Sequence, residues 1–574
     1  DVEWRPPANQ GASVLLAAVA VARARLLELP CSPPSPSRAR RPDRPMKRRA
    51  EDGQISRAAY ELRSESSQQA APAGFAVASS RELESRRLVK ASKGKGGGWA
   101  GRGETALARE LYQTRVSALN AKFAAWAETQ LAAEPNVAVL EAARDYVNYA
   151  EQLEAQFLVA HTDVLSFGSG DCGQLAHSGD LEDERDTVVP RPRRVLSLRE
   201  KKVVMLSCGG LHNAACTADG KCYTWGCNDE GSLGRGGDEY LPMEVAVATG
   251  DPVTCVAAGD SQTFAVTMSG GVFGWGCYKD KEGKQWFDAP PNAGLDPKRK
   301  QSTPLEVSRG SPLSSVVAVK CGAAFNAALL GDGSCLTWGV GEVGELGRPV
   351  RPMRGADGDY DKPAIVSDHL SPGHLSGLEA TTFKALGCGA YHLLAATSSA
   401  LYATGLNNYG QLGDGSTTDA ATPVPVPFFD DVALAQLDGG QHHSLALCAD
   451  GTLYSWGRAD YGQLGIGVDV GAKAGDFVTA PTRVPVPTTA VGSVCSGSNH
   501  CLALSRSGAV FAWGYGDMNA LGLGTAVDKF EPEKVSFASS LGDKAEIVVT
   551  QVAGGGQHSA VVASVKQFAP GAGL

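Results

Sequence analysis

The sequence predicts an all-β protein, a seven-bladed β-propeller closed by its N- and C-terminal strands. Three observations support this prediction. A glycine phrase recurs seven times between Phe167 and Gly524, a second phrase that ends in histidine alternates with it, and the array opens and closes on different halves of one unit. A disordered basic tail and a short α-helical hairpin are expected in front of the array.

The glycine phrase is a short apolar strand that ends in an aromatic or small residue followed by glycine. Regular copies continue with four residues, Gly or Asn, one residue and then Leu. Successive start glycines lie 50 to 66 residues apart, so one supersecondary unit repeats with loops of different length. The seven copies start at Phe167-Gly168, Trp225-Gly226, Trp275-Gly276, Trp338-Gly339, Thr404-Gly405, Trp456-Gly457 and Trp513-Gly514.

The second phrase is a Val/Ala-rich strand that runs into Gly-x-x-His and on into another apolar strand. Turns such as Asp219-Gly220 and Ser507-Gly508 indicate antiparallel hairpins, and about four strands per unit is typical of a propeller blade. Because the array opens on a glycine half and closes on a histidine half, its two ends should complete one blade and leave no free edge. The copies are residues 209–212, 389–392, 439–442, 497–500 and 555–558.

Composition narrows the function classes. The chain is 43% hydrophobic with 69 glycines, which suits a β fold rich in tight turns, and no apolar run reaches membrane-spanning length. Its 14 cysteines form no Cys-x-x-Cys pair, so we expect buried thiols in the cytosol or nucleus and no zinc or disulfide framework. Nothing resembles a hydrolytic triad or a phosphate-cradling loop, and neither a metal nor a cofactor is expected.

Charge divides the chain into two parts. The net charge is −9, yet residues 1–102 carry 19 Lys and Arg against 10 Asp and Glu. The basic front can reach nucleic acid or an acidic groove, whereas the acidic body should seek a basic partner. We expect 1–45 to be disordered or untranslated with Met46 as the start, 46–102 to be a basic disordered tail, 103–160 to be helical, 161–567 to be the propeller and 568–574 to be a tail.

Six stretches of the array resemble the regulator of chromosome condensation family: 226–235 (GCNDEGSLGR), 258–267 (AGDSQTFAVT), 406–413 (LNNYGQLG), 439–447 (GGQHHSLAL), 457–465 (GRADYGQLG) and 510–516 (VFAWGYG). The similarity covers residues 164–566. It implies a chromatin-associated guanine-nucleotide exchange factor for the small GTPase Ran, acting in nucleocytoplasmic transport and mitosis. Such a factor works by binding the nucleotide-free GTPase more tightly than the loaded one. The alternative is a non-catalytic nuclear scaffold that binds Ran, importin-α or chromatin.

The third glycine phrase breaks after Gly276 and continues as CYKDKEG. The resemblance implies that this segment is the wedge hairpin that such a factor pushes against the phosphate loop of the GTPase. A tolerated loop insertion would give the same sequence pattern. By the same resemblance, the Ran-binding residues are Asp171, Tyr278, Lys279, Asp280 and Arg348. The residues of the exchange face are Asp260, His442, His443 and His558.

Other readings of these residues stay open. The Gly-x-x-His histidines recur, so they could hydrogen-bond the backbone inside their own blade; this is favoured for His212, His392 and His500 and is open for His442, His443 and Asp260. Gln262 and the segment 323–325 (AAF) depart from the family pattern, which favours the scaffold alternative.

The loop 349–363 follows the fourth glycine phrase and carries two arginines. The resemblance implies that Arg351 and Arg354 contact the acidic patch of the nucleosome, and arginine suits bidentate binding of carboxylates. An ordinary solvent-exposed loop would look the same.

The front of the chain has apolar residues at helical spacing in 103–160, which predicts two amphipathic helices joined near Pro135. Residues 117–154 resemble the importin-α-binding motif of a nuclear-basket nucleoporin, and a helical cap on the propeller is the plainer reading. The resemblance places six basic residues in the acidic groove of importin-α, while 86–102 could instead bind DNA phosphates. It therefore adds importin-α and nucleosomal DNA as partners and the nuclear pore basket as a location, with no membrane or small-molecule substrate. The six are Lys47, Arg48, Arg49, Arg86, Arg87 and Lys90.

Overall fold

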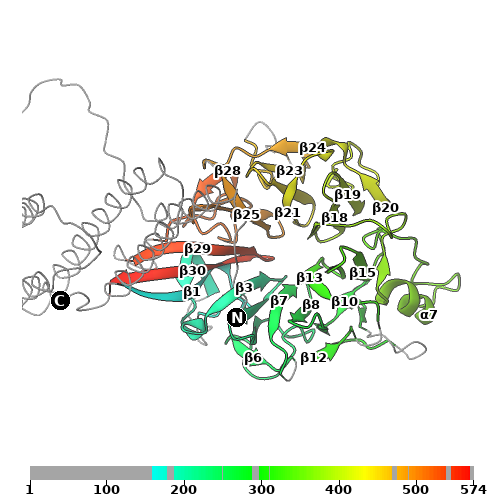
Figure 1. Ribbon diagram of the computed structural model, residues 1–574, viewed down its shortest axis with the longest axis horizontal. Helices are drawn as coiled ribbons and strands as arrows, with labels where there is room; N and C mark the ends of the chain where they lie inside the picture. Colours follow the sequence, from blue (N-terminus) through cyan, green and yellow to red (C-terminus); the bar gives the residue numbers. More distant parts are fainter. Residues whose placement is uncertain are drawn as a thin grey trace, which may run out of the picture. The chain divides into compact units, whose positions relative to one another are not determined.

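The described part of the chain is a ring of seven four-stranded antiparallel sheets (Figure 1). The computed structural model describes residues 158–177, 187–247, 250–287, 297–308, 311–313, 315–467, 473, 475–488, 490–537 and 545–568. Residues Ala160–Gln567 form one compact unit. The predicted basic tail, the helical hairpin and the six importin-α-binding residues lie outside the described residues.

Each sheet is one blade, with strands a to d counted outward from the centre of the ring. Blade 1 joins the two ends of the array, because β1 pairs with β30; this confirms the predicted closure. Its strands are β29 (Ala545–Gly554), β30 (His558–Phe568), β1 (Leu158–Ser169) and β2 (Val188–Arg194).

Blades 2 to 4 follow along the chain. Blade 2 consists of β3 (Val203–Cys208), β4 (His212–Thr217), β5 (Cys222–Gly226) and β6 (Met243–Val245). Blade 3 consists of β7 (Val253–Ala258), β8 (Gln262–Thr267), β9 (Val272–Gly276) and β12 (Gln301–Glu306). Blade 4 consists of β13 (Val316–Cys321), β14 (Phe325–Leu330), β15 (Cys335–Gly339) and β16 (Gly373–His374).

Blades 5 to 7 complete the ring. Blade 5 consists of β17 (Ala385–Cys388), β18 (His392–Ala396), β19 (Leu401–Gly405) and β20 (Ala420–Pro425). Blade 6 consists of β21 (Leu434–Gly439), β22 (His443–Cys448), β23 (Leu453–Arg458) and β24 (Phe477–Arg483). Blade 7 consists of β25 (Val491–Ser496), β26 (His500–Ser505), β27 (Val510–Gly514) and β28 (Lys529–Lys534).

Short elements lie in the connections. Blade 3 inserts the hairpin β10 (Tyr278–Lys279) and β11 (Gln285–Trp286) between its strands c and d. Before its strand d, blade 4 carries the short helix α7 (Lys362–Ala364), which runs on into one π-helical turn, η2 (Ile365–Leu370). The 3-10 helices are η1 (Leu196–Leu198) and η3 (Pro427–Phe429).

Each strand c ends in glycine because the backbone at that position lies in close contact with the a–b turn of the same blade. All seven start glycines have positive φ, between 95° and 121°. A Cβ atom on Gly276 would lie 2.2 Å from the carbonyl oxygen of Ser261, in the a–b turn of the same blade. Only glycine combines this φ with this approach, so the phrase marks the end of a strand that touches its own turn.

The aromatic and leucine residues that recur in the phrase fill the space between blades. Trp225, Trp275, Trp456 and Trp513 are fully buried, and the leucines that follow are buried with them. The core is therefore a series of clusters between adjacent sheets, which is how a propeller buries its apolar surface.

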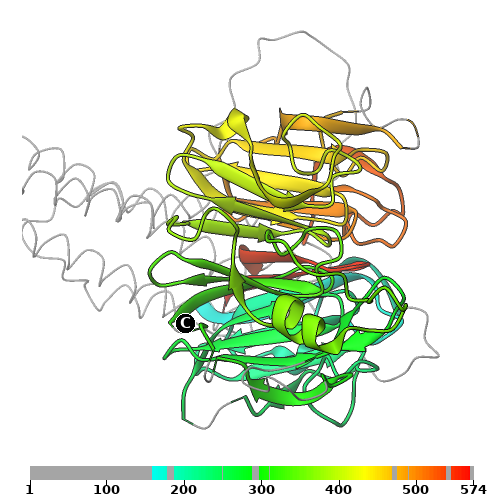
Figure 2. The same ribbon diagram turned by 90° about the vertical axis from the view of Figure 1, so that its right-hand side faces the viewer.

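Strand direction assigns the loops to two faces. Because neighbouring strands are antiparallel, the a–b turns and the c–d loops emerge at one end of every blade, which we call the upper face. The b–c turns and the d–a connections emerge at the opposite face. Figure 2 shows the ring from its side, with α7 and the loop before it turned toward the viewer.

Candidate functional site

The upper face gathers most of the residues that the sequence predicts to be functional. Asp171 lies in the c–d loop of blade 1 and Asp260 in the a–b turn of blade 3, and both are exposed. His442 lies in the a–b turn of blade 6 and is half-buried. The hairpin β10–β11 rises from the same face.

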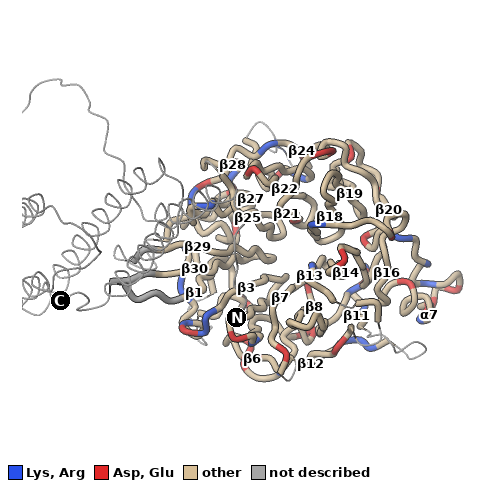
Figure 3. Tube along the Cα trace, in the orientation of Figure 1, with Lys and Arg blue, Asp and Glu red and all other residues tan. Residues whose placement is uncertain are grey.

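The upper face carries charged residues of both signs. Exposed carboxylates come from five blades: Asp171, Asp229, Asp260, Asp419 and Asp517. Basic residues gather around the hairpin of blade 3: Lys279, Lys281, Lys284, Lys298, Arg299 and Lys300. Figure 3 shows both charges along the tube of the ring. An acidic surface with one basic corner suits a partner of the opposite pattern.

The broken third phrase forms a two-stranded hairpin, in which Tyr278 pairs with Trp286 and Lys279 with Gln285. Asp280 organises the tip: its Oδ1 accepts the backbone N–H groups of Glu282 (3.0 Å) and Lys284 (2.9 Å). Its Oδ2 accepts the indole N–H of Trp286 at 3.0 Å. Asp280 is 7% exposed, so it shapes the hairpin and offers little surface of its own.

Tyr278 explains how blade 3 can dispense with the regular loop. In four other interfaces, the strand-c tryptophan donates its indole N–H to a carbonyl in the c–d loop of the preceding blade, for example Trp225 to Gln174 at 3.0 Å. In blade 4, Trp338 donates instead to the Tyr278 hydroxyl at 3.1 Å, and the Asn326 amide lies 3.1 Å from the same hydroxyl. Tyr278 is 1% exposed, and burial raises its pKa. Its hydroxyl therefore replaces the missing loop carbonyl inside the ring.

Removing that hydroxyl is expected to destabilise the ring. Tyr278→Phe removes the hydroxyl that the buried Trp338 N–H and the Asn326 amide share, at a cost of about 1 kcal/mol, because the Asn326 side-chain oxygen can still accept the indole N–H. The measurement is the urea midpoint at pH 7. Tyr515→Phe is the matched control, because the Tyr515 hydroxyl bonds Asp517 at the surface; equal midpoints for the two variants would contradict this role.

His443 and His558 lie inside the ring. Both are 0% exposed, and burial, followed by nearby histidines, lowers the pKa of each to about 3. The Nε2–H group of His558 donates to Asn213 Oδ1 at 2.8 Å, which links blade 1 to blade 2. His443 Nε2 lies 3.0 Å from Ser496 Oγ in blade 7. These two predicted residues of the exchange face are thus blade-to-blade links and can influence a bound protein only through their neighbours.

The register in blade 6 differs from the sequence reading by one residue. Strand β22 begins at His443, and the Gly-x-x-His unit is therefore 440–443, not 439–442. The reason is that Gly457, which ends strand c, packs on the backbone of His442 and His443 as Gly226 packs on Leu211 and His212. His442 accordingly occupies the turn position and faces the surface.

His442 belongs to an aromatic cluster that spans blades 5 and 6. Its ring lies 5.9 Å from that of Tyr391 and 5.1 Å from that of Tyr409. The Arg458 guanidinium lies 5.1 Å from the ring of Tyr409 and 4.9 Å from that of Tyr461. Burial and the charge of Arg458 lower the pKa of His442 to about 4, so it is neutral at pH 7. Tyrosine and arginine are enriched where protein interfaces bind most strongly.

This cluster contains residues that the sequence prediction missed. Arg458 also forms a two-pronged pair with Asp460, at 2.7 and 2.9 Å. The sequence does indicate this cluster, because the stretch 457–465 contains Arg-Ala-Asp-Tyr in a loop whose other residues are small or polar.

Arg348 is an internal clamp. It donates to the backbone carbonyls of Thr337, Gly373, Asp368 and Ser371, at 2.9 to 3.2 Å, and so fastens the long c–d connection of blade 4. Burial lowers its pKa to about 10. Arg235 holds the same position in blade 2 and binds the carbonyls of Thr224 and Leu241.

Arg351 and Arg354 are exposed but already paired. Arg351 binds Asp368 of η2 through two contacts of 2.7 and 3.0 Å, within the c–d connection of blade 4. Arg354 binds Glu282, which belongs to the hairpin of blade 3. A carboxylate partner would therefore have to compete with these internal acids.

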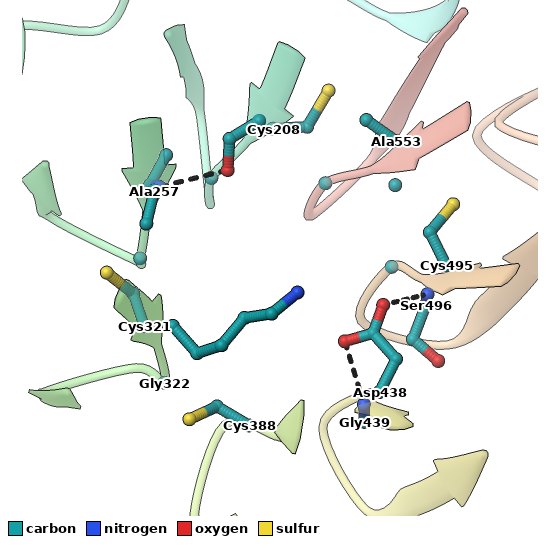
Figure 4. A pocket seen from close by; sticks show the side chains of 18 of the residues that line it. Cys208, Ala257, Cys321, Gly322, Cys388, Asp438, Gly439, Cys495, Ser496 and Ala553 are labelled. Carbon is teal, nitrogen blue, oxygen red and sulfur yellow. Dashed lines mark hydrogen bonds between the residues drawn. The ribbon is translucent and has the colours of Figure 1, made fainter. Parts of the chain in front are cut away.

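The centre of the ring is a channel of about 430 Å³, lined by the a strands of all seven blades (Figure 4). Asp438 lies in it and accepts backbone N–H groups of Gly439 (3.0 Å) and Ser496 (3.1 Å), while burial raises its pKa. The described cysteines are all free, and ten of the thirteen are buried. Within the described ranges, no group of three or more His, Cys, Asp or Glu is placed to hold a metal ion, and no helix is long and apolar enough to cross a membrane.

Comparison with known proteins covers the whole ring. The RCC1-like domain matches residues 163–561. The human regulator of chromosome condensation is 33% identical over 418 residues, which cover 70% of this chain and 91% of the relative. The guanine nucleotide exchange factor SRM1 of Saccharomyces cerevisiae is 28% identical over 431 residues, which cover 67% of this chain and 84% of the relative.

Solved structures give the same assignment. The crystal structure of Prp20p from Saccharomyces cerevisiae, described with its binding to Gsp1p and histones, aligns with a TM-score of 0.62 and 26% identity, over 74% of this chain and 96% of that one. The same yeast protein bound to Kap60 aligns with a TM-score of 0.61 and 26% identity, over 74% and 93%. The chain therefore belongs to the regulator of chromosome condensation family, whose members carry the RCC1-like domain.

Proposed function

We propose that this protein is a guanine-nucleotide exchange factor for the GTPase Ran and that the GTPase binds the upper face. The observation that carries the proposal is the β10–β11 hairpin. Among the described residues it is the one two-stranded insertion in a c–d loop, and it stands on the face where Asp171, Asp260 and His442 are accessible. The exchange factor SRM1 and the Gsp1p-binding Prp20p support this assignment as relatives.

The reaction needs no covalent chemistry. Exchange is accelerated if the ring binds the nucleotide-free GTPase more tightly than the nucleotide-bound form, because only differential affinity shifts the equilibrium. The acidic part of the face attracts a basic GTPase surface, whereas the aromatic cluster around His442 offers rigid contact area. The hairpin, stiffened by Asp280, supplies a wedge whose shape is set before binding.

Complex formation tests the proposal directly. Ran stripped of nucleotide should co-elute with the chain in gel filtration, and added GDP or GTP should separate the two proteins. A complex that forms equally well with GDP-loaded Ran and resists nucleotide would instead favour the non-catalytic scaffold.

Chromatin association is proposed for a different part of the chain, namely the long loop of blade 4 and the basic tail. Arg351 and Arg354 would bind histone carboxylates after exchanging their internal partners Asp368 and Glu282, and tail residues would bind DNA phosphates. Prp20p, whose structure was described with its histone binding, supports this. The proposed locations are the nucleus and the nuclear pore basket.

Importin-α binding is proposed for the basic tail, on the sequence resemblance and on the solved complex of Prp20 with Kap60. The test is a pull-down in which Lys47, Arg48, Arg49, Arg86 and Arg87 are replaced by alanine. We expect binding to importin-α to be lost while binding to Ran is kept. Unchanged binding to importin-α would remove this part of the proposal.

A further inference from the structure

The hairpin of blade 3 is clasped by a loop of the next blade. Arg354 belongs to the loop 349–363 of blade 4, and its Nε donates to Glu282 Oε1 at 3.1 Å, with a second contact between Nη2 and Oε2. Glu282 is at the hairpin tip, 72 residues earlier in the chain. Glu342, also from blade 4, accepts the backbone N–H of Lys281 at 2.8 Å and pairs with its ammonium at 3.3 Å.

Tyr360 is the centre of this clasp. Its hydroxyl lies 3.0 Å from Asp280 Oδ2 and 3.1 Å from Glu282 Oε2. Two cations lie over its ring, the Lys284 ammonium at 3.5 Å and the Arg354 guanidinium at 4.0 Å from the centroid. The ring is also 4.9 Å from that of Trp286, so Tyr360 contacts residues from both sides of the hairpin.

The contact between the loop and the hairpin tip is polar and leaves space. A cavity of about 250 Å³ lies between them, lined by residues of the hairpin tip and of the loop. The base of the hairpin, by contrast, is buried through Tyr278 and Trp286. Loss of the clasp should therefore free the tip without unfolding the blade.

We infer that the loop 349–363 positions the exchange hairpin through Arg354 and Tyr360. The contacts between the loop and the hairpin do not depend on the proposed function. Their consequence does rest on it, namely that the hairpin presents one shape to the GTPase. A partner carboxylate that takes Arg354 from Glu282 also loosens the hairpin, and a partner that holds the hairpin makes Arg354 harder to take. The proposed chromatin contact and the proposed exchange site thus share one ion pair.

The experiment is hydrogen–deuterium exchange of the segment 277–287 in the full chain. Arg354→Gln and Tyr360→Phe together should raise the exchange rate of the tip amides about 10-fold, because they remove one ion pair, the cation–π contact of Arg354 and the two hydrogen bonds of the Tyr360 hydroxyl. Arg351→Gln is the matched control. Arg351 pairs with Asp368 and Ser367 of η2, inside the same c–d connection, so its replacement should leave the hairpin amides unchanged. The charge-swapped pair Glu282→Arg with Arg354→Glu should restore most of the protection lost in Arg354→Gln.

Unchanged protection of 277–287 in the double variant, with the urea midpoint also unchanged, would overturn the inference. Release of fluorescent GDP from Ran is measured on the same proteins and separates the two claims. If the amides are exposed while GDP release keeps its original rate, the clasp stands and the role of the hairpin in exchange falls.

Discussion

Lowering the pH from 7 to 5 is expected to remove most of the free energy of unfolding of the ring. The cause is a set of five buried imidazoles, one in each of five blades, whose pKa values burial lowers to about 3 or about 4. The Nε2–H groups of His212, His392 and His500 donate to a hydroxyl of the next blade at 2.7 to 2.8 Å. The Nδ1 atoms of His392, His443 and His558 are buried without a partner, so a second proton would find no acceptor.

The sign follows from the direction of the shifts. Below the ordinary histidine pKa of about 6.5 the unfolded chain takes up protons that the folded ring refuses, so stability is complete above that pH and falls toward pH 4. At pH 5 each imidazole costs up to about 2 kcal/mol, and five cost up to about 10 kcal/mol. Domains of this kind are stable by only about 5–15 kcal/mol. The measurement is the urea midpoint by circular dichroism at pH 7, 6 and 5.

The ring contains its own control for this prediction. Blade 3 has Gln262 in place of the histidine, and the Gln262 amide donates to the Gly322 carbonyl of blade 4 at 3.0 Å. His500→Gln should therefore fold, and its urea midpoint should fall less steeply with pH than that of the original chain. An identical pH dependence would show that carboxylates elsewhere, and not the imidazoles, govern acid unfolding.

Replacing Asp260 and His442 together by alanine is expected to lower kcat/KM for GDP release from Ran roughly 100-fold, the size expected when two strong interface contacts are removed. The two residues lie on blades 3 and 6, so their effects should add. Asp260 is exposed, with its carboxylate bonded to Ser261 at 3.3 Å, and the urea midpoint at pH 7 should change little.

Asp219→Ala is the control for that pair of substitutions. Asp219 is an exposed carboxylate in the b–c turn of blade 2, on the face opposite to the upper face. It should leave GDP release unchanged although it removes the same charge as Asp260→Ala. If Asp219→Ala reduced release as much as the double variant, general electrostatic attraction would explain the effect and no specific upper-face site would be needed.

The blades could be predicted from the sequence because their chemistry is local and repeated. Gly276 and its counterparts are required wherever strand c meets its own turn, and the tryptophans recur because each interface needs the same volume filled. The histidine register was also encoded, since Gly440 precedes His443 by the same three residues that separate Gly209 from His212. The resemblance directed attention to His443 as a contact residue, whereas the repeat indicated structural histidines that bond the backbone of their own blade. That expectation is wrong about the partner, because His212, His392 and His500 bond hydroxyl groups of the next blade.

The clasp and the hydroxyl of Tyr278 could not be predicted in this way. Each depends on a contact between a loop of one blade and a loop or strand of the next, 60 to 80 residues apart. Neither contact repeats among the residues that the structure describes. A tyrosine hydroxyl that takes the place of a backbone carbonyl occurs at one position and does not show in the repeat pattern of the sequence. From the sequence, Arg354 was expected to be available to bind a carboxylate of a partner. Only the fold shows that it already pairs with Glu282.

The most direct test of the account is the release of fluorescent GDP from purified Ran in the presence of substoichiometric amounts of the full chain and excess GTP. The account predicts that release accelerates in proportion to the concentration of the chain and that each ring serves many GTPase molecules. Release that stays at the intrinsic rate of Ran at micromolar concentrations of the folded chain would contradict the exchange function.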